Sequence, residues 1–284
     1  MKLNFDGKGL TETPEVVFEA NHLIELSLYN NRIEEIPERL FLQQRELEVL
    51  NYAGNEIEEL SEGIKNLINL RMLDLGHNKL KKLPKEIGLL TSLDSFLYLS
   101  NNQFEHLPDE ICELYQLKYL NVTDNRLKGL PPSMGNLKSL IELRLYHNQI
   151  EQLPESLTTI TNLREMHLYG NQLKNLPERL GNLEQLRILD LEDNKLKGLP
   201  KSIGNLKKLR RLNLRTNKLT ELPEEAGGLS NLIELDLREN DLKEIPDSIT
   251  YLENLEKLDL RWNKNLKVAK WLDDLENKGC IVYL

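Results

Sequence analysis

The segment from Arg187 to Leu219 reads RILDLEDNKLKGLPKSIGNLKKLRRLNLRTNKL, and it states the phrase LxLxxNKL twice, first from Leu189 and again from Leu212. The leucines and the asparagine keep their places in both copies, whereas the residues between them change from Asp, Glu and Asp to Asn, Arg and Thr. A fixed apolar frame with variable polar residues inside it is typical of repeat proteins, in which each unit adds one layer to a shared core.

The asparagine of this phrase recurs through nearly the whole chain. Eight of the ten intervals between its copies equal the interval from Asn194 to Asn217, and the other two are longer by a single position. Before the first copy, Leu3, Phe5 and Leu10 take the apolar positions of an incomplete unit in which Lys8 replaces the asparagine. We therefore predict about twelve units. The asparagine stands at Asn31, Asn55, Asn78, Asn102, Asn125, Asn148, Asn171, Asn194, Asn217, Asn240 and Asn263.

Each unit is predicted to contain one strand and one crossover. Leu189 and Leu191 alternate with polar residues, the period of a strand with one buried face. Because the next strand runs in the same direction, the pairing must be parallel. A Leu-Pro pair in most units, replaced by Leu60-Ser61 in one, starts a short helical or 3₁₀ turn. The asparagine amide can bond both its own bend and a neighbouring unit. The predicted fold is α/β, a right-handed solenoid with a parallel sheet on its concave face and short helical or 3₁₀ turns on its convex face.

Two units carry one extra residue. The first insertion lies in RLFLQQREL at 39–47, where a convex loop can absorb it. The second lies in SLDSFLYLSNN, between Leu93 and Asn102. It is interpreted either as a β-bulge that interrupts the strand and re-aims Phe96 or Tyr98, or as a tolerated insertion without a role.

The repeat covers residues 1–266, and residues 267–284 are predicted to form a helix-strand cap. Gly279 is placed to end the helix, and the final CIVYL has the composition of a strand. Ile281 and Tyr283 follow Leu258 and Leu260, the last two strand leucines, by one regular repeat interval, so we predict that both are buried. No such cap precedes the first unit, so either that unit is shortened or a partner covers its edge. The apolar face of the predicted helix consists of Trp271, Leu272 and Leu275.

The second half of each unit recurs as LPKEIGLLTSL, LPPSMGNLKSL, LPERLGNLEQL and LPKSIGNLKKL. Together with LxxLxLxxNxL, this pattern resembles the leucine-rich repeat family over nearly the whole chain. Units of this length and wording are similar to those of Ras-associated intracellular leucine-rich repeat adaptors and their plant and bacterial relatives. The resemblance implies a protein-binding solenoid, with a partner linked to a small GTPase if the Ras-associated likeness carries over. No residue of the sequence identifies such a partner.

Composition narrows the class of protein. The net charge of −9 disfavours a general nucleic-acid binder, which needs a basic stripe, and no apolar run approaches the length of a membrane span. The start, MKLNFDGKGL, has no apolar segment of a signal peptide. Cys112 and Cys280 are far apart, without the spacing of a disulfide-rich module. We therefore predict a cytoplasmic protein, although export by a signal-independent route would leave the same features.

The residues between the repeated leucines are predicted to emerge on the concave face. Twelve strands about 4.8 Å apart would form an arc of about 50–55 Å, which suits a protein partner. Tyrosine and histidine combine an apolar face with a polar tip, a mixture that is enriched at interface hot spots. The alternatives are favourable cross-strand pairs for the tyrosines and a solvated, self-neutralising lattice for the arginines and aspartates. The predicted partner-binding residues are Tyr98, Tyr119, Tyr146, His147, His167, Tyr169, Arg215, Arg238, Arg261 and Trp262.

Catalysis is not supported by the arrangement of reactive residues. His167 and Asp190 occupy neighbouring positions and could act as a base and its orienting acid, but no nucleophile lies near them. Cys112 falls on the convex side and Cys280 in the cap. The His/Asp pair lacks metal-ligand spacing, and no glycine-rich phosphate loop is present. We predict no catalytic residue, cofactor or metal site, and instead a hydrogen-bonded ladder of Arg144, His167 and Asp190.

The predicted function is that of a protein–protein interaction module, an adaptor, scaffold or recognition domain in signalling that acts as a monomer. It would bind one protein partner, and it would bind no nucleic acid and insert into no membrane. The alternative is a recognition fragment of a secreted effector or of a larger regulatory protein whose activity lies in another domain.

Overall fold

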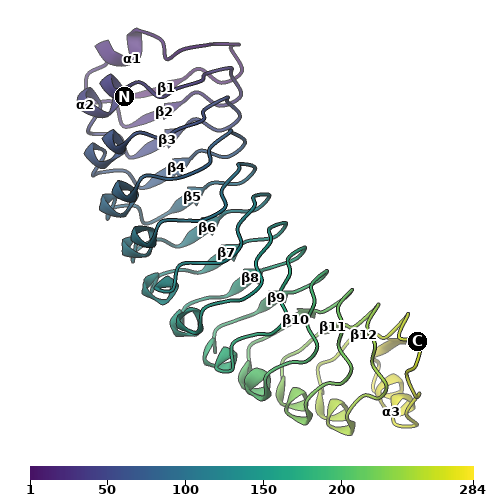
Figure 1. The fold of residues 1–284 in the computed structure, drawn as a ribbon. Coiled ribbons are helices and arrows are strands. Elements are labelled where there is room, and N and C mark those ends of the chain that lie inside the picture. The colour runs from purple at the N-terminus through teal and green to yellow at the C-terminus, as the bar shows by residue number, and fades with distance from the viewer. The chain divides into compact units, whose positions relative to one another are not determined.

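The computed structural model describes all of residues 1–284, which form two compact units, Met1–Leu140 and Ile141–Leu284. Both units are built from the same repeat: a three-residue strand, a bend at the repeated asparagine and a short helical turn. Within each unit, Figure 1 shows the strands stacked along one side and the helical turns along the other. This is the predicted arrangement of sheet and turns. No helix of the chain is both long and apolar enough to cross a membrane.

The first unit contains six parallel strands in chain order, each joined to the next by a helical turn. Its strands are β1 (Lys2–Asn4), β2 (Glu25–Ser27), β3 (Val49–Asn51), β4 (Met72–Asp74), β5 (Phe96–Tyr98) and β6 (Tyr119–Asn121). Its turns are α1 (Val16–Glu19), α2 (Glu38–Gln43), η1 (Glu62–Asn66), η2 (Lys85–Leu89), η3 (Asp109–Glu113) and η4 (Met134–Asn136), where η denotes a 3₁₀ helix.

The second unit contains seven parallel strands, also in chain order. Its strands are β7 (Glu142–Arg144), β8 (Glu165–His167), β9 (Ile188–Asp190), β10 (Arg211–Asn213), β11 (Glu234–Asp236), β12 (Lys257–Asp259) and β13 (Ile281–Tyr283). Its turns are η5 (Glu155–Thr159), η6 (Leu180–Asn182), η7 (Lys201–Asn205), η8 (Glu224–Gly228), η9 (Asp247–Tyr251) and α3 (Leu272–Asn277).

The core of each unit is a stack of leucine layers. The middle residue of every strand from β2 to β12 is a leucine or methionine that is at most 2% exposed. Equivalent residues pair in register, as Leu50 does with Leu73 and Leu189 with Leu212. Because side chains alternate along a strand, the residues on either side of these leucines point away from the core.

The repeated asparagine connects each turn of the chain to the one before it. Asn171 Nδ2 donates to the carbonyl oxygens of Leu168, in its own bend, and Leu145, in the preceding repeat, at 3.0 and 2.9 Å. Its Oδ1 accepts a hydrogen bond from Ile150 N at 3.1 Å. The same set of contacts surrounds Asn55 in the first unit. The predicted double role of the amide is confirmed.

The Leu-Pro pairs start the helical turns as predicted. Pro200, with φ −67° and ψ 146°, is extended and directly precedes the 3₁₀ turn η7. Where Ser61 replaces proline, its hydroxyl oxygen accepts a hydrogen bond from Gly63 N at 2.9 Å, the usual contact of a serine N-cap. In that unit, a side-chain hydrogen bond therefore starts the helical turn in place of the fixed φ angle of proline.

The two insertions are absorbed in different places. The first lengthens α2 into a six-residue α-helix, on the helical side as predicted. The second does not interrupt a strand, because β5 pairs residue for residue with β4 and β6. The bulge interpretation is therefore wrong. The extra residue lies at Asp94–Ser95, ahead of the strand, where Ser95 N donates to Arg71 O at 3.1 Å. This position leaves Phe96 and Tyr98 in the ordinary outward orientation.

The C-terminal cap contains the predicted helix. Leu272 and Leu275 of α3 are 4% and 1% exposed and cover the last leucine layer. Trp271 directly precedes the helix rather than belonging to it. Gly279 has a φ of 95°, a left-handed conformation that suits a residue just beyond a helix end.

The strand of the cap is shifted by a single position from its predicted register. β13 pairs Val282 with Leu258 and Tyr283 with Asp259, so this last interval is longer by one than the regular repeat. A slip of one position exchanges the two faces of a strand. The prediction that Ile281 and Tyr283 are buried is therefore wrong, because they are 57% and 38% exposed.

Candidate functional site

The candidate site is the outward surface of the strands, which we call the strand face of each unit. It carries the residues that stand six, four and two positions before each repeated asparagine, and at its edge lies the bend residue directly before the asparagine, such as His147 and Trp262. Backbone hydrogen bonds between parallel strands hold these positions in register, so the fold fixes where each side chain starts without fixing its type.

Three aromatic residues form the first aromatic cluster, on the strand face of the first unit. Phe96 and Tyr98 of β5 stack with ring centroids 5.7 Å apart, and Tyr119 of β6 lies 5.5 and 5.0 Å from them. Phe96 is 42% exposed. The structure thus brings the predicted Tyr98 and Tyr119 together and adds Phe96, which was not among the predicted site residues.

The second aromatic cluster lies in the second unit and consists of Tyr146, His147 and Tyr169. The His147 ring contacts both tyrosines, at 5.5 Å from Tyr146 and 4.7 Å from Tyr169, and each pair is edge-to-face. Gly170 leaves room for this arrangement, because a Cβ atom there would lie only 2.7 Å from His147 Cδ2. Three predicted residues therefore form one surface.

His167 contacts glutamates rather than the predicted aspartate. Its Nε2 atom lies 3.3 Å from Glu165 Oε2 and 4.0 Å from Glu142 Oε1, while Arg144 Nε donates to Glu142. Asp190 accepts a hydrogen bond from the backbone of its own strand end, at 3.2 Å from Glu192 N. The predicted hydrogen bond between His167 and Asp190 is wrong, because the glutamates of the strand-start positions lie closer to the imidazole.

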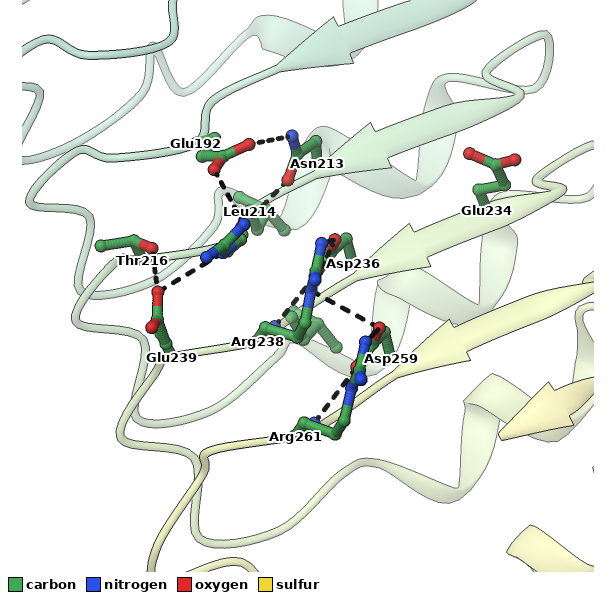
Figure 2. A network of polar contacts seen from close by, with 12 residues as sticks. Glu192, Asn213, Leu214, Thr216, Glu234, Asp236, Arg238, Glu239, Asp259 and Arg261 are labelled. Atoms are coloured by element: carbon green, nitrogen blue, oxygen red, sulfur yellow. Dashed lines mark hydrogen bonds and ion pairs between the residues drawn. The ribbon is translucent and has the colours of Figure 1, made fainter. Parts of the chain in front are cut away.

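Arg238 and Arg261 lie in a network of carboxylates at the C-terminal end of the second unit (Figure 2), and Arg215, the third predicted arginine, contacts Glu192 and Glu239. Arg238 donates to Asp236 on its own strand, with Nε–Oδ1 2.9 Å, and lies 3.5 Å from Asp259 on the next. Arg261 donates to Asp259 with Nη2–Oδ2 2.7 Å. This pairing agrees with the alternative prediction, in which the arginines and aspartates of this face form a solvated lattice that neutralises itself.

Trp262 lies between two of these arginines. The Arg215 and Arg261 guanidinium carbons lie 5.8 and 5.5 Å from the centroid of its ring. Arg215 also lies between two carboxylates, at 3.5 Å from Glu192 and 3.4 Å from Glu239. Trp262 itself is 56% exposed. A large aromatic surface is therefore displayed beside fixed positive charges, which is favourable for cation–π contacts.

Two carboxyl groups of this face have shifted pKa values. Burial raises the pKa of Asp190, and the charge of Glu192 adds to this effect, while the hydrogen bond from Glu192 N only partly offsets it. For Asp259, burial alone would raise the pKa, but hydrogen bonds from Arg261 and the charges of Arg238 and Arg261 outweigh it, so the pKa is lowered. Asp259, which is 0% exposed, is thus held as a carboxylate between two guanidinium groups.

The strand face of the second unit has one shallow hollow, of about 320 Å³, lined by residues of β8 to β12. Half of its lining residues are charged, among them Asp190, Arg211, Glu234 and Arg238, and His167 also lines it. Cys112, the one cysteine of the helical turns, is 1% exposed, and burial raises the pKa of its thiol to about 12. A thiol with so high a pKa is a poor nucleophile at neutral pH.

The residues that the sequence analysis did not predict share one position in the repeat. Phe96, Glu142 and Glu165 all stand six positions before a repeated asparagine. Tyr119, which was predicted, stands at the same repeat position. Examining the position six before the asparagine together with the positions four and two before it would therefore have found these residues.

Comparison with known proteins agrees with this architecture. The family model described as "Leucine-rich repeat region" matches residues 45–172 and 186–277, and a second, "Leucine Rich repeats (2 copies)", matches residues 161–201. These matches cover well over half of the chain, which therefore belongs to the leucine-rich repeat family. A comparison with curated proteins returns no match.

Solved structures of similar proteins include two from bacteria. A leucine-rich repeat protein of Leptospira interrogans is 27% identical, with 99% of this chain and 95% of that chain covered and a TM-score of 0.52. An internalin of Listeria monocytogenes is 26% identical, with 99% and 86% covered and a TM-score of 0.73. The predicted similarity to bacterial leucine-rich repeat proteins is confirmed.

A plant peptide hormone receptor, RGFR1, solved in complex with RGF2, is 31% identical with a TM-score of 0.76. The alignment covers 84% of this chain and 40% of the receptor, so the chain spans about two fifths of the receptor's length. Leucine-rich repeat domains serve as protein-recognition modules and are typically not enzymes, which agrees with the predicted class of function.

Proposed function

We propose that this protein is a recognition module that binds a protein partner on the strand face of Ile141–Leu284. The observation that carries the proposal is the second aromatic cluster, in which the His147 ring joins Tyr146 and Tyr169 into one surface. Aromatic side chains of this kind provide a large contact area with little conformational freedom to lose.

The surroundings of the cluster favour a polar partner surface. Tyr146 and Tyr169 are half-buried, and a backbone hydrogen bond of 2.8 Å from His147 N to Tyr169 O holds the two repeats together beside them. Trp262, flanked by Arg215 and Arg261, offers a second anchor on the same strand face. An interface with aromatic anchors and a charged rim is the usual anatomy of a specific protein complex. The complex of the plant receptor with RGF2 supports this class of function by analogy.

The finer description is part of the same proposal. We infer an adaptor or scaffold role in the cytoplasm, acting as a monomer. Cys112 and Cys280 are both free and buried, which suits a reducing compartment. A partner linked to a small GTPase remains an expectation from the resemblance alone.

Capture of partners by matched variants tests the site. The wild-type chain, a Tyr146→Ala/Tyr169→Ala double variant and a Tyr251→Ala control are immobilised, and the captured proteins are quantified. Tyr251, 73% exposed in η9, is a tyrosine of the helical side. We expect at least one protein to be captured by the wild type and the control and lost, by about tenfold or more, from the double variant. Equal capture by all three would move the interface away from the second aromatic cluster.

A further inference from the structure

Three potential metal ligands converge on the strand face of the second unit, next to the second aromatic cluster. Glu142 of β7 and Glu165 of β8 are register partners, and His167 follows Glu165 by two positions, on the same side of the strand. One side-chain atom from each of the three lies within 4.8 Å of those of the other two. The side chains of Glu142 and His167 are each 20% exposed, and that of Glu165 is 36% exposed.

The charge balance of this cluster favours a cation. Like charges directly opposite each other on paired strands repel, and Glu142 and Glu165 are such a pair. Asp190, the register partner of His167, adds a third carboxyl group beside the imidazole. Arg144, which donates to Glu142, is a permanent cation bonded to this group, and its single charge offsets only part of the negative charge. A divalent ion would relieve the remaining repulsion.

We propose that Glu142, Glu165 and His167 bind a divalent transition-metal ion, with Zn²⁺ as the best-fitting one. One imidazole nitrogen and two carboxylate oxygens form a borderline ligand set that suits Zn²⁺, whereas Mg²⁺ and Ca²⁺ prefer oxygen ligands alone. Three protein ligands in a partly exposed position leave a fourth coordination position open to water or to a donor atom of a partner. This site goes beyond the proposed protein binding and does not depend on it.

Two of the three ligand separations lie near those of a tetrahedral site, and the third, between Glu142 and Glu165, is within 4.8 Å. Two ligand atoms of a tetrahedral Zn²⁺ ion, each about 2.0–2.2 Å from the metal, lie about 3.3–3.6 Å apart. The separation of His167 Nε2 from Glu165 Oε2, 3.3 Å, is within this range, and its separation from Glu142 Oε1, 4.0 Å, is slightly longer. A carboxylate can keep the hydrogen bond from Arg144 while it binds the metal, and such a bond orients the ligand.

Titration of the full chain with Zn²⁺ tests the proposal. Isothermal calorimetry at about pH 7.5, where an ordinary imidazole is neutral, compares the wild type with His167→Gln, Glu165→Gln and the control His147→Gln. His147 lies on the same strand face but outside the three-ligand group. We expect one Zn²⁺ ion per wild-type chain with micromolar or tighter affinity, unchanged in His147→Gln and weakened about tenfold or more in the other two variants. Excess Mg²⁺ should not compete.

Three results would overturn the site. They are the absence of Zn²⁺ binding to the wild type at tens of micromolar, wild-type affinity in both His167→Gln and Glu165→Gln, and equal loss of affinity in His147→Gln. Binding of Co²⁺ to the wild type gives a measurement that does not depend on variants. Its visible spectrum should show tetrahedral bands, and a thiolate charge-transfer band would instead assign the metal to Cys112 or Cys280 and refute the proposal. Far-UV circular dichroism confirms that each variant is folded.

Discussion

Replacing Asn171 by alanine tests the physical role of the repeated asparagine. The side chain is 7% exposed and makes three short hydrogen bonds to backbone atoms, as donor to Leu145 O and Leu168 O and as acceptor from Ile150 N. A fourth, longer bond of 3.4 Å runs to Tyr169 O, which keeps a hydrogen bond of 2.8 Å from His147 N. Alanine removes all four, and the three short ones should dominate the loss. The side chain is short and lies in the bend rather than in the leucine layers, so lost hydrogen bonds should dominate the effect on the free energy of unfolding.

The magnitude depends on which backbone groups keep a partner. Leu145 O also accepts a hydrogen bond from Asn148 Nδ2, and Leu168 O also accepts one from Asn194 Nδ2, both at 3.0 Å. Those two carbonyl groups therefore lose one bond each, worth about 0.5–1.5 kcal/mol. Ile150 N has no second acceptor within hydrogen-bonding distance, and a buried N–H group left unpaired costs about 1–3 kcal/mol. The three contributions total about 2–6 kcal/mol.

Urea unfolding followed by both far-UV circular dichroism and tryptophan fluorescence measures the loss, because coincident curves show whether the repeats unfold together. The control is Tyr169→Ala on the strand face, which removes a ring contact with His147 and should cost no more than about 1.5 kcal/mol. At about 2 °C of melting temperature per kcal/mol for a chain of this size, the asparagine variant should melt about 4–12 °C lower. Equal losses in both variants, or a loss below about 0.5 kcal/mol for Asn171→Ala, would refute the reasoning.

Three more outcomes follow from single positions. Gly204→Ala should destabilise by about 1–3 kcal/mol, because its Cβ would overlap a carbonyl oxygen of the next helical turn, whereas Gly198→Ala, with open space around it, should not; urea midpoints decide between them. Cys112, whose pKa is raised to about 12 by burial, should react with a thiol reagent at pH 8 only after unfolding, and rapid labelling of the folded chain would contradict its burial. The pKa of Asp259 is lowered by Arg261 despite burial, so its ionised form stabilises the fold above about pH 4, and this contribution is lost as pH falls through the folded-state pKa. The Asp259→Asn variant should therefore be less stable than the wild type at pH 7 and should lose less stability on acidification. Acid unfolding curves of both proteins measure this difference.

The strands could be predicted from the sequence because a single physical requirement repeats in every unit. Leu189 and Leu212 have to be buried in equivalent layers, and parallel pairing forces equal spacing on the residues between them. The same logic placed the helical turns at the Leu-Pro pairs. It failed at the C-terminal cap, where the chain between Leu258 and Val282 is longer by a single position than a repeat and no second copy of the unit reveals the shift.

The side-chain partners on the strand face could not be predicted in the same way. When only residues at the same repeat position are compared, His167 is paired with Asp190 on the neighbouring strand. Residues two positions away on the same strand are then neglected. Contacts within one strand are nevertheless made, because Arg238 and Arg261 each donate to an aspartate two positions earlier in the chain. Both kinds of neighbour are within reach of a long side chain, and only the actual rotamers decide between them.

The bend before each repeated asparagine distinguishes what the fold requires from what it merely permits. The residue preceding every one of the eleven asparagines has a positive φ, a conformation that glycine and asparagine adopt at the lowest energetic cost. Gly54, Gly170 and Asn101 meet this requirement in the usual way, but the fold also tolerates other residue types at this position, namely His77, Asp124, Asp193, Thr216 and Glu239. His147 and Trp262 occupy it with rings, at φ 52° and 64°, and the contacts of those rings are what distinguishes them. The His147 ring joins two tyrosines, and the Trp262 ring lies between two arginines. A position that the fold leaves free to vary is thus occupied here by aromatic side chains that enlarge the candidate interface, which supports the proposal that this strand face is used for recognition.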